Sequence, residues 1–171
     1  MATVVELGAV EGFILDDPIA GVLDNTEYTL GGTVFKDISS KVRALTIQRG
    51  KNRDLDRFNA GQLNITLANN DRAFDPNYPS SPYAGAIVPR REIRVTVDGV
   101  RTMTATVDDW NYNYTPDGEA IAEIVASDDF TLLARQVLTT GTATPQLTGA
   151  RIAEVLDQPS VEWPADKRSL D

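Results

Sequence analysis

The chain has 171 residues, of which 42% are hydrophobic and 24% are charged, a balance typical of one or two folded globular domains. It contains no cysteine and no histidine, which excludes disulfides, thiolate nucleophiles, Cys/His zinc sites and Ser-His-Asp triads. The net charge of −9 argues against a surface that binds phosphate backbones throughout.

No apolar run reaches the roughly 18 residues that a membrane span needs, so we expect no membrane insertion. The first residues, MATVVELGAVEG, lack a basic start and a continuous apolar block, so we expect no signal peptide.

The charges are unevenly distributed along the chain. Residues 1–40 contain seven acids and one base, residues 41–57 contain six bases, and residues 108–129 contain seven acids and no base. Separated zones of this kind suit self-association or docking to neighbouring proteins, whereas ordinary solvated faces are the alternative explanation.

Alternating apolar and polar residues predict β-strands through most of the chain. Residues 1–40 have the pattern of short strands and turns, and further strands are expected at 45–48, 63–67 and 93–97. Asp98-Gly99 predicts a two-residue hairpin turn, because glycine accepts the positive φ of a type I′ turn. The return strand is expected at 100–107, and a last strand follows the Asp117-Gly118 turn at 119–126.

The segment 75–90, DPNYPSSPYAGAIVPR, contains four prolines. Proline cannot donate a hydrogen bond to a sheet, so this segment predicts a stiff extended loop. We expect this loop to reach a neighbouring subunit, with Phe74 as the anchor at its base.

Helical patterns occur late in the chain. Asp128 or Asp129 is expected to cap a helix over DDFTLLARQVL, and Thr148 to cap a second one over GARIAEVLDQ. The predicted fold is therefore mainly β, with barrel- or sandwich-like antiparallel sheets and one or two short C-terminal helices. The expected domains are a β-rich domain at 1–127 and a small helical appendix at 128–171.

Two groups of oxygen-bearing side chains resemble cation ligands. The first, at alternate positions, is Asp109, Asn111, Asn113, Asp117 and Glu119. The second is Asn70, Asp71 and Asp75. The first group lacks the glycine and the final glutamate of a calcium loop, and the second has the chemistry of a turn. We therefore expect no metal, no cofactor and no catalytic residues, and the protein is expected not to be an enzyme.

The bases between residues 49 and 57 alternate with Asp54 and Asp56. This favours ion pairs within or between subunits over contacts with nucleic acid.

Residues 49–95 contain a string of spaced elements. They are an RG turn, an acidic-aromatic turn ending in AG, an alternating strand, an N-x-D-R-x-F-D-P element, an SPY loop and a P-R-R strand start. They occupy 49–50, 56–61, 63–67, 70–76, 81–83 and 89–91. With these elements the segment resembles the N-terminal part of minor tail proteins of long-tailed bacteriophages. Residues 13–32 and 127–136 also resemble such proteins.

The resemblance implies a structural virion protein at the distal end of the tail, in a β-rich barrel fold. It implies that the chain forms a ring with itself, a trimer being favoured, and contacts the tail tube and the distal tail, tip or fibre proteins. Such proteins are often longer, which leaves two alternatives: residue 171 is the true end, or the chain is part of a larger protein with further domains. The interface candidates are Arg49, Arg53, Arg57, Phe74, Tyr78, Tyr83, Arg90, Arg91 and Trp110.

Two other functions are kept as alternatives. The first is a carbohydrate-binding β module that contacts the host cell surface through Trp110, Tyr112 and Tyr114. The second is an enzyme acting on the cell wall, which the lack of histidine and of a convincing acid pair disfavours.

Overall fold

The computed structural model describes residues 2–11, 15–24, 28, 32–50, 59–135, 146–159, 161 and 163. The chain divides into two compact units, Met1–Asp128 and Asp129–Asp171. The first unit contains the strands and the second contains the two α-helices of the described residues.

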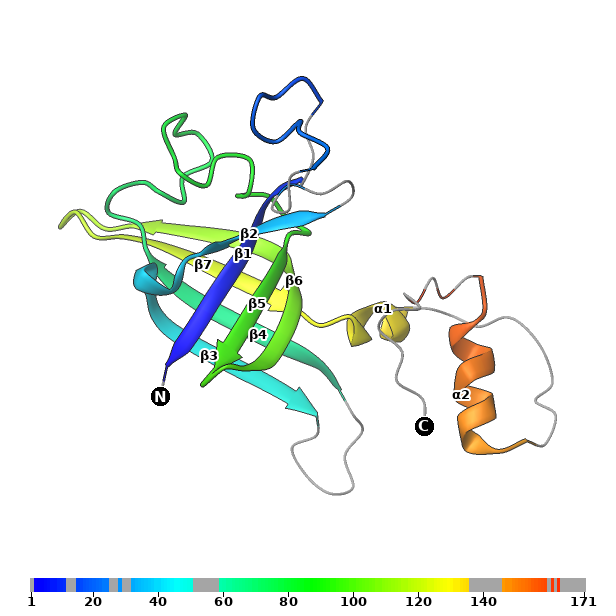
Figure 1. Ribbon diagram of the computed structural model, residues 1–171. Helices are drawn as coiled ribbons and strands as arrows, with labels where there is room; N and C mark the ends of the chain where they lie inside the picture. Colours follow the sequence, from blue (N-terminus) through cyan, green and yellow to red (C-terminus); the bar gives the residue numbers. More distant parts are fainter. Residues whose placement is uncertain are drawn as a thin grey trace. The chain divides into compact units, whose positions relative to one another are not determined.

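The first unit is built on one antiparallel sheet of seven strands, in the order β2-β1-β5-β6-β7-β4-β3. The strands are β1 (Thr3–Glu11), β2 (Thr33–Asp37), β3 (Val42–Gly50), β4 (Asn59–Ala68), β5 (Glu92–Val97), β6 (Val100–Tyr114) and β7 (Ala120–Ser127). Figure 1 shows that this sheet curls strongly, so that one face encloses the core. The predicted fold class, mainly antiparallel β with short C-terminal helices, is confirmed.

The two edge strands of the sheet, β2 and β3, are consecutive in the chain and are joined by a short 3-10 turn, η1 (Ser39–Lys41). The joining segment is tied to β1. The Ile38 N–H donates to the Val5 carbonyl at 2.9 Å, and the Val5 N–H donates to the Ser39 hydroxyl at 2.8 Å. These bonds hold the segment between the two edge strands against β1.

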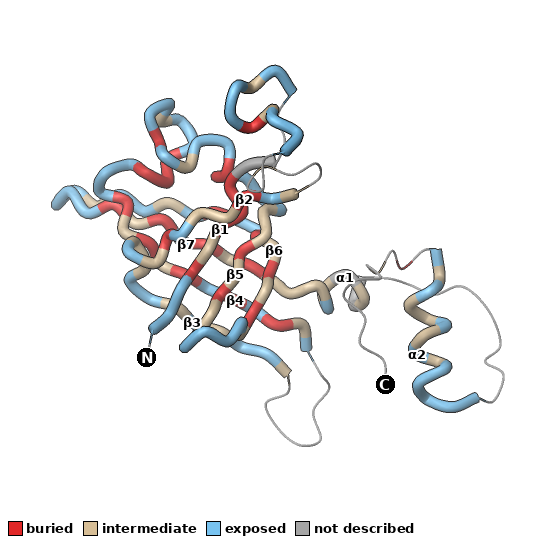
Figure 2. Tube along the Cα trace, in the orientation of Figure 1, coloured by how far each residue is buried: buried red, intermediate tan, exposed pale blue. Residues whose placement is uncertain are grey.

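The core follows the predicted alternation of apolar residues (Figure 2). Leu63, Ile65 and Leu67 of β4 point inward and are buried, while Gln62 and Asn64 face solvent. The Asp98-Gly99 turn has positive φ at both residues, 48° and 81°, as the type I′ prediction requires. The hairpin it closes joins β5 to β6.

Strand β6 continues seven residues beyond its predicted end at Val107. The prediction stopped there because a β-bulge changes the phase of the side chains. The register of β6 with β7 shifts between Val107 and Asp109. Met103, Ala105 and Val107 face the core before the bulge, and Trp110 faces it after the bulge. One extra residue reverses which positions point inward. Asp108-Asp109 therefore has the appearance of a strand end in the sequence but lies within one strand.

Gly8 of β1 lies where no Cβ fits. A methyl group there would lie 2.9 Å from Thr33 Cγ2 and 3.1 Å from the Glu92 carbonyl oxygen, and that oxygen belongs to the neighbouring strand β5. We expect Gly8→Ala to lower the free energy of unfolding by about 1–3 kcal/mol, the usual range for overpacking. Urea unfolding would measure this, with Gly149→Ala as control, because a Cβ at Gly149 meets no atom within 4 Å. Equal midpoints for the two variants would contradict the prediction.

The second unit contains α1 (Phe130–Arg135) and α2 (Thr148–Leu156). The prediction that Thr148 caps the second helix is wrong. The N-cap is Leu147, whose extended backbone precedes the helix, and its side chain makes no capping bond. Thr148 is already in the first turn, so its hydroxyl does not take the cap position. In the described part of the chain, no helix is long and apolar enough to cross a membrane.

Candidate assembly surface

Residues 69–91, here called the cap, close one end of the core with a series of tight turns (green in Figure 1). Successive N–H groups each donate to the carbonyl three residues earlier: Arg72 to Asn69, Asp75 to Arg72, Tyr78 to Asp75, Ser81 to Tyr78 and Ala84 to Ser81, at 2.9–3.2 Å. The cap is therefore not the extended arm that the prolines predicted. It folds back on its own barrel.

The spacing of the prolines explains this compact path. Pro76, Pro79 and Pro82 each follow the first residue of one turn, and proline at that second position favours type I and II turns because its ring fixes φ. Three prolines at intervals of three residues thus predict consecutive turns. Each proline taken singly indicates only a break in the sheet.

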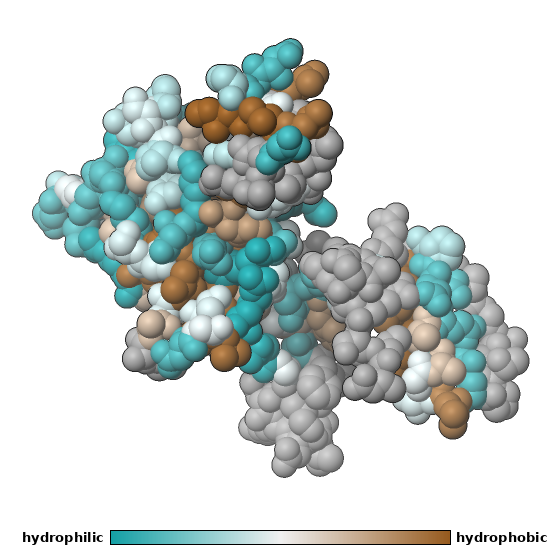
Figure 3. Space-filling model, in the orientation of Figure 1, coloured by the Kyte–Doolittle hydropathy of each residue, from teal (hydrophilic) through white to brown (hydrophobic). Residues whose placement is uncertain are grey.

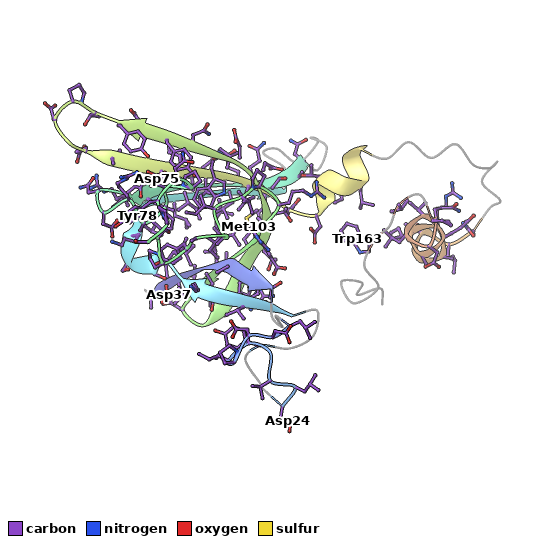
Figure 4. All side chains as sticks on the ribbon, turned by 90° about the horizontal axis from the view of Figure 1, so that it is seen from above. Asp24, Asp37, Asp75, Tyr78, Met103 and Trp163 are labelled. Carbon is purple, nitrogen blue, oxygen red and sulfur yellow. The ribbon has the colours of Figure 1, made fainter. Side chains whose placement is uncertain are left out.

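Side chains fasten the turns to each other. The Asn69 amide oxygen accepts the Phe74 N–H at 2.8 Å, and the Ser81 hydroxyl donates to the Ala73 carbonyl. Asp75 accepts the Asn77 N–H at 2.9 Å, and Figure 4 shows Asp75 and Tyr78 close together in the cap. From the sheet, the Lys36 ammonium donates to the Pro82 carbonyl at 2.7 Å. These bonds fix the path of the cap and therefore the residues that it presents to solvent.

Four aromatic rings form a row that runs from the cap to β6. Tyr83 stacks on Phe74 with ring centres 4.8 Å apart and planes 3° apart. The ring centres of Phe74 and Trp110 are 6.2 Å apart, and those of Trp110 and Tyr112 are 6.5 Å apart. The Trp110 indole N–H donates to the Val88 carbonyl at 3.3 Å. Offset stacking of this kind adds to the stability that burial alone supplies.

This row corrects two of the interface candidates. Phe74 and Trp110 are buried within their own subunit, so they have no surface to offer a neighbour. The burial of Trp110 also takes one of its three rings from the carbohydrate alternative, in which Tyr112 is half-buried and Tyr114 is exposed. Aromatic residues in the sequence marked the internal anchors of the cap and not its outer surface.

Because of Tyr112, at the end of the row, we expect the free energy of unfolding to fall at high pH. Burial raises the pKa of its phenol from 10.0 to about 12. A phenol that ionises later in the folded state stabilises the protein below pH 10, and this contribution disappears as the pH rises toward 12. We expect the urea midpoint to fall across this window, and to fall less in Tyr112→Phe. Burial also raises the pKa of Tyr83, so the slope should not vanish. An unchanged slope in Tyr112→Phe would contradict the assignment.

The structure shows where the two groups of candidate cation ligands lie, and the second group has protein partners. Asn70 accepts the Ala120 N–H at 2.8 Å, Asp71 pairs with Lys41 at 2.5 Å, and Asp75 pairs with Arg72 at 2.7 Å. The side-chain hydrogen bond from Lys41 lowers the pKa of Asp71, and that from Arg72 lowers the pKa of Asp75. These three residues therefore act in turn and ion-pair contacts.

In the other group, Asp109, Asn111 and Asn113 lie at alternate positions of β6, about 7 Å apart along the strand. They are too widely spaced to surround one ion. The described residues contain no group of three or more acidic side chains that would hold a metal ion.

The remaining interface candidates lie in two places on the first unit. Arg49, near the end of β3, donates to the Thr102 carbonyl of β6. Tyr78, Tyr83, Arg90 and Arg91 lie in the cap, and the Arg90 N–H donates to the Val107 carbonyl of β6. About 17 Å of strand separates these two carbonyls. Arg53 and Arg57 lie outside the described residues.

Within the cap, Arg90 is exposed, Tyr78 is half-exposed beneath the Arg72 guanidinium, and Arg91 is half-buried and donates to the Gly85 carbonyl at 3.1 Å. The candidates with exposed side chains thus form two separate patches, one on the cap and one at Arg49.

Sequence reasoning missed Asn69 and Ser81, which hold the cap together from buried positions. It also missed four exposed aliphatic side chains in the loop that follows β1, namely Leu15, Ile19, Val22 and Leu23. For Ser81, the signal was its place directly before a proline in the period of three.

Comparison with known proteins gives a low-identity likeness to a solved structure. No family model matches the chain, and no curated protein sequence matches it. A solved structure, the 43 kDa tail protein of prophage MuSo2 from Shewanella oneidensis, aligns with 92% of the chain at 15% identity and a TM-score of 0.47. The chain is similar to part of a prophage tail protein. It aligns with 38% of that protein's chain, so it spans well under half of it.

Proposed function

We propose that the chain is a non-enzymatic structural protein of a phage virion, located at the tail tip or baseplate. In this proposal it assembles as a ring, a trimer being favoured, and connects the tail tube to distal tip or host-contacting proteins. The MuSo2 likeness names the same class of virion component but is too weak to serve as support. The support comes from how the resembling elements are used in this fold.

The observation that carries the proposal is that these elements, distant in the chain, pack against each other. The turn that ends in AG meets the resembling segment 127–136: the Asp128 N–H donates to the Gly61 carbonyl at 3.0 Å. A Cβ on Gly61 would lie 2.5 Å from the Asp128 carboxylate, so the two residues are in close contact.

The other elements meet in the cap. Phe74 of the N-x-D-R-x-F-D-P element stacks on Tyr83 of the SPY loop. The P-R-R start is bonded to β6, because the Arg90 N–H donates to the Val107 carbonyl and the Val107 N–H donates to the Arg91 carbonyl. A string of residues in which each element has a defined contact is better explained by a common local fold than by chance similarity.

Immunogold labelling of intact phage particles, with antibody to this chain, tests the proposal. We expect gold at the distal end of the tail, or gold there only after the tip has been partly disrupted. Particles grown without the gene serve as the antibody control. Absence of signal from both intact and disrupted virions would refute the proposal. Chemical crosslinking of disrupted tips should then give a ladder that ends at the trimer.

A further inference from the structure

Strand β3 is an edge of the sheet, and in the described part of the chain no strand pairs with its outer side. In an antiparallel ladder each residue directs its N–H and C=O groups to the same side, and successive residues alternate. The Asp128 N–H donates to the Gly61 carbonyl, so the odd-numbered residues of β4 bond to β7 and the even-numbered ones bond to β3. Even-numbered residues of β3 face these, so Leu45 and Ile47 direct their backbone groups outward.

Strand β6 has a second free edge beyond Val107. Among the described residues, the neighbours on the β5 side pair with β6 as far as Val107, and further along the ladder continues with β7 alone. The Thr115 N–H donates to the Glu119 carbonyl, so the odd-numbered residues after the bulge bond to β7. Tyr112 and Tyr114 therefore direct their N–H and C=O groups away from β7. Figure 1 shows this end of the β6–β7 hairpin projecting past the other strands.

These two edges lack the usual protection against pairing with another chain. Native edges are short, or carry proline, a bulge or a charge where a strand could add. Residues 44–48 of β3, ALTIQ, and 111–114 of β6, NYNY, contain no proline and no charge. By contrast, the other edge strand, β2, has five residues and carries Lys36. Figure 3 shows hydrophilic surface over the projecting end of the hairpin, so a contact there depends on backbone pairing and charge rather than on an apolar patch.

The two edges match each other in register and in face. One antiparallel register sets Leu45 opposite Tyr114 and Ile47 opposite Tyr112, so that all four residues with outward backbone groups are paired. Leu45, Ile47 and Tyr112 all pack against the core of their own subunit, so their side chains would lie on the same face of the joined sheet. Uncharged polar residues would face each other on the opposite side. The joined sheet therefore keeps one apolar and one polar face.

The ends of the two edges also match in charge. Arg49 lies near the end of β3, and Asp108 lies at the bulge where the free edge of β6 begins. The register above brings Arg49 of one copy beside Asp108 of the other. Arg49 donates to the neutral Thr102 carbonyl and makes no ion pair among the described residues. Arg43, at the other end of β3, already pairs with Glu119 of its own chain at 3.2 Å, so the charge match depends on Arg49.

Pairing between two like edges is disfavoured by charge. Two antiparallel β3 strands would set Arg43 opposite Arg49, and two β6 edges would set Asp109 opposite Asp117. Like charges directly opposite each other destabilise a strand pair. The contact that avoids both repulsions joins a β3 edge to a β6 edge.

We propose that β3 of one copy pairs antiparallel with the free edge of β6 in a second copy. The two edges are different surfaces, so the contact is head-to-tail, and such contacts generate rings when the rotation closes. The inference rests on the proposed function in that it gives a ring-forming subunit its two mating edges.

Sedimentation of the full chain tests this pairing. The wild type should sediment above its monomer mass of 18.6 kDa as concentration rises. Tyr114→Pro should remain monomeric, because proline removes an N–H that the pairing needs and that the subunit's own ladder does not use. Tyr114→Ala is the matched control, since it removes the ring but keeps the N–H, and it should associate like the wild type. A monomeric wild type, an associating Tyr114→Pro, or equal loss in both variants would overturn the pairing.

An exchange of charges gives a second test that does not depend on proline. Arg49→Glu and Asp108→Arg should each weaken self-association by about tenfold or more, because each sets like charges together at the contact. Both side chains are exposed, so neither change removes a buried contact. In a mixture of the two variants, the new acid of one copy meets the new base of the other, and association should return. A mixture as weak as the separate variants would contradict the proposed register.

The pairing and the proposed function fail separately. Gold at the tail tip, with Tyr114→Pro sedimenting like the wild type, would refute the pairing alone. Association restored in the mixture of charge variants, without any gold on virions, would refute the virion role alone.

Discussion

Replacing Phe74 with alanine is expected to lower the free energy of unfolding by about 3–5 kcal/mol, the usual cost of removing a buried aromatic side chain. Phe74 is fully buried, and its ring is the link between Tyr83 of the cap and Trp110 of β6. Its removal leaves a cavity between cap and sheet and breaks two stacked contacts. Urea or guanidinium unfolding, followed by tryptophan fluorescence and by circular dichroism, measures the change.

Two comparison variants separate the causes. Tyr114→Ala removes a ring of similar size from an exposed position and should change stability by no more than about 0.5 kcal/mol. Phe74→Leu keeps much of the buried volume but loses the stacking, so it should lie between the two. If Phe74→Ala were as stable as Tyr114→Ala, the cap would not be anchored by this ring.

The loss at Phe74 should also extend to assembly. A cap that no longer packs on the barrel would present a disordered surface at the end of the subunit. Impaired incorporation into particles, together with impaired folding, would fit an internal anchor. Impaired incorporation with unchanged folding would instead fit the interface role first assigned to Phe74.

The strands were predictable from the sequence because each has one buried face. Residues 63–67 and 93–97 alternate apolar and polar side chains, and alternation is a local property that needs no knowledge of the partner strand. The hairpin at Asp98-Gly99 was predictable for the same reason, since its turn chemistry is contained in two residues. Where a bulge shifts the phase, as at Asp108 in β6, the alternation breaks, so a prediction from alternation ends the strand too early.

The candidate surface was less predictable, because burial of an aromatic residue depends on the tertiary fold. Trp110 and Tyr114 lie on the same side of β6, yet the first is covered by the cap and the second extends past it. Their sequence context does not distinguish a ring that anchors a subunit's own loop from one that contacts a neighbour. The exposed aliphatic loop was missed for the opposite reason, since apolar residues near turns were assigned to short strands.

The neighbouring asparagines at the start of the cap provide the last prediction, because each accepts one backbone N–H at 2.8 Å in a different environment. Asn69→Ala should cost about 1–3 kcal/mol, because Asn69 is fully buried and the Phe74 N–H would lose its partner where water does not reach it. Asn70→Ala should cost about 0.5 kcal/mol or less, because Asn70 is exposed and water can replace its amide oxygen.

The two variants delete the same atoms one residue apart, so their difference in unfolding free energy measures the effect of burial. The Asn69 side-chain N–H group has no hydrogen-bond partner among the described residues, so its removal is not expected to add to the cost. The loss is assigned to the Phe74 N–H together with the small cavity that the truncation of a buried side chain leaves. Equal losses in paired urea titrations would mean that water reaches the Phe74 N–H, and that the cap does not close this end of the barrel.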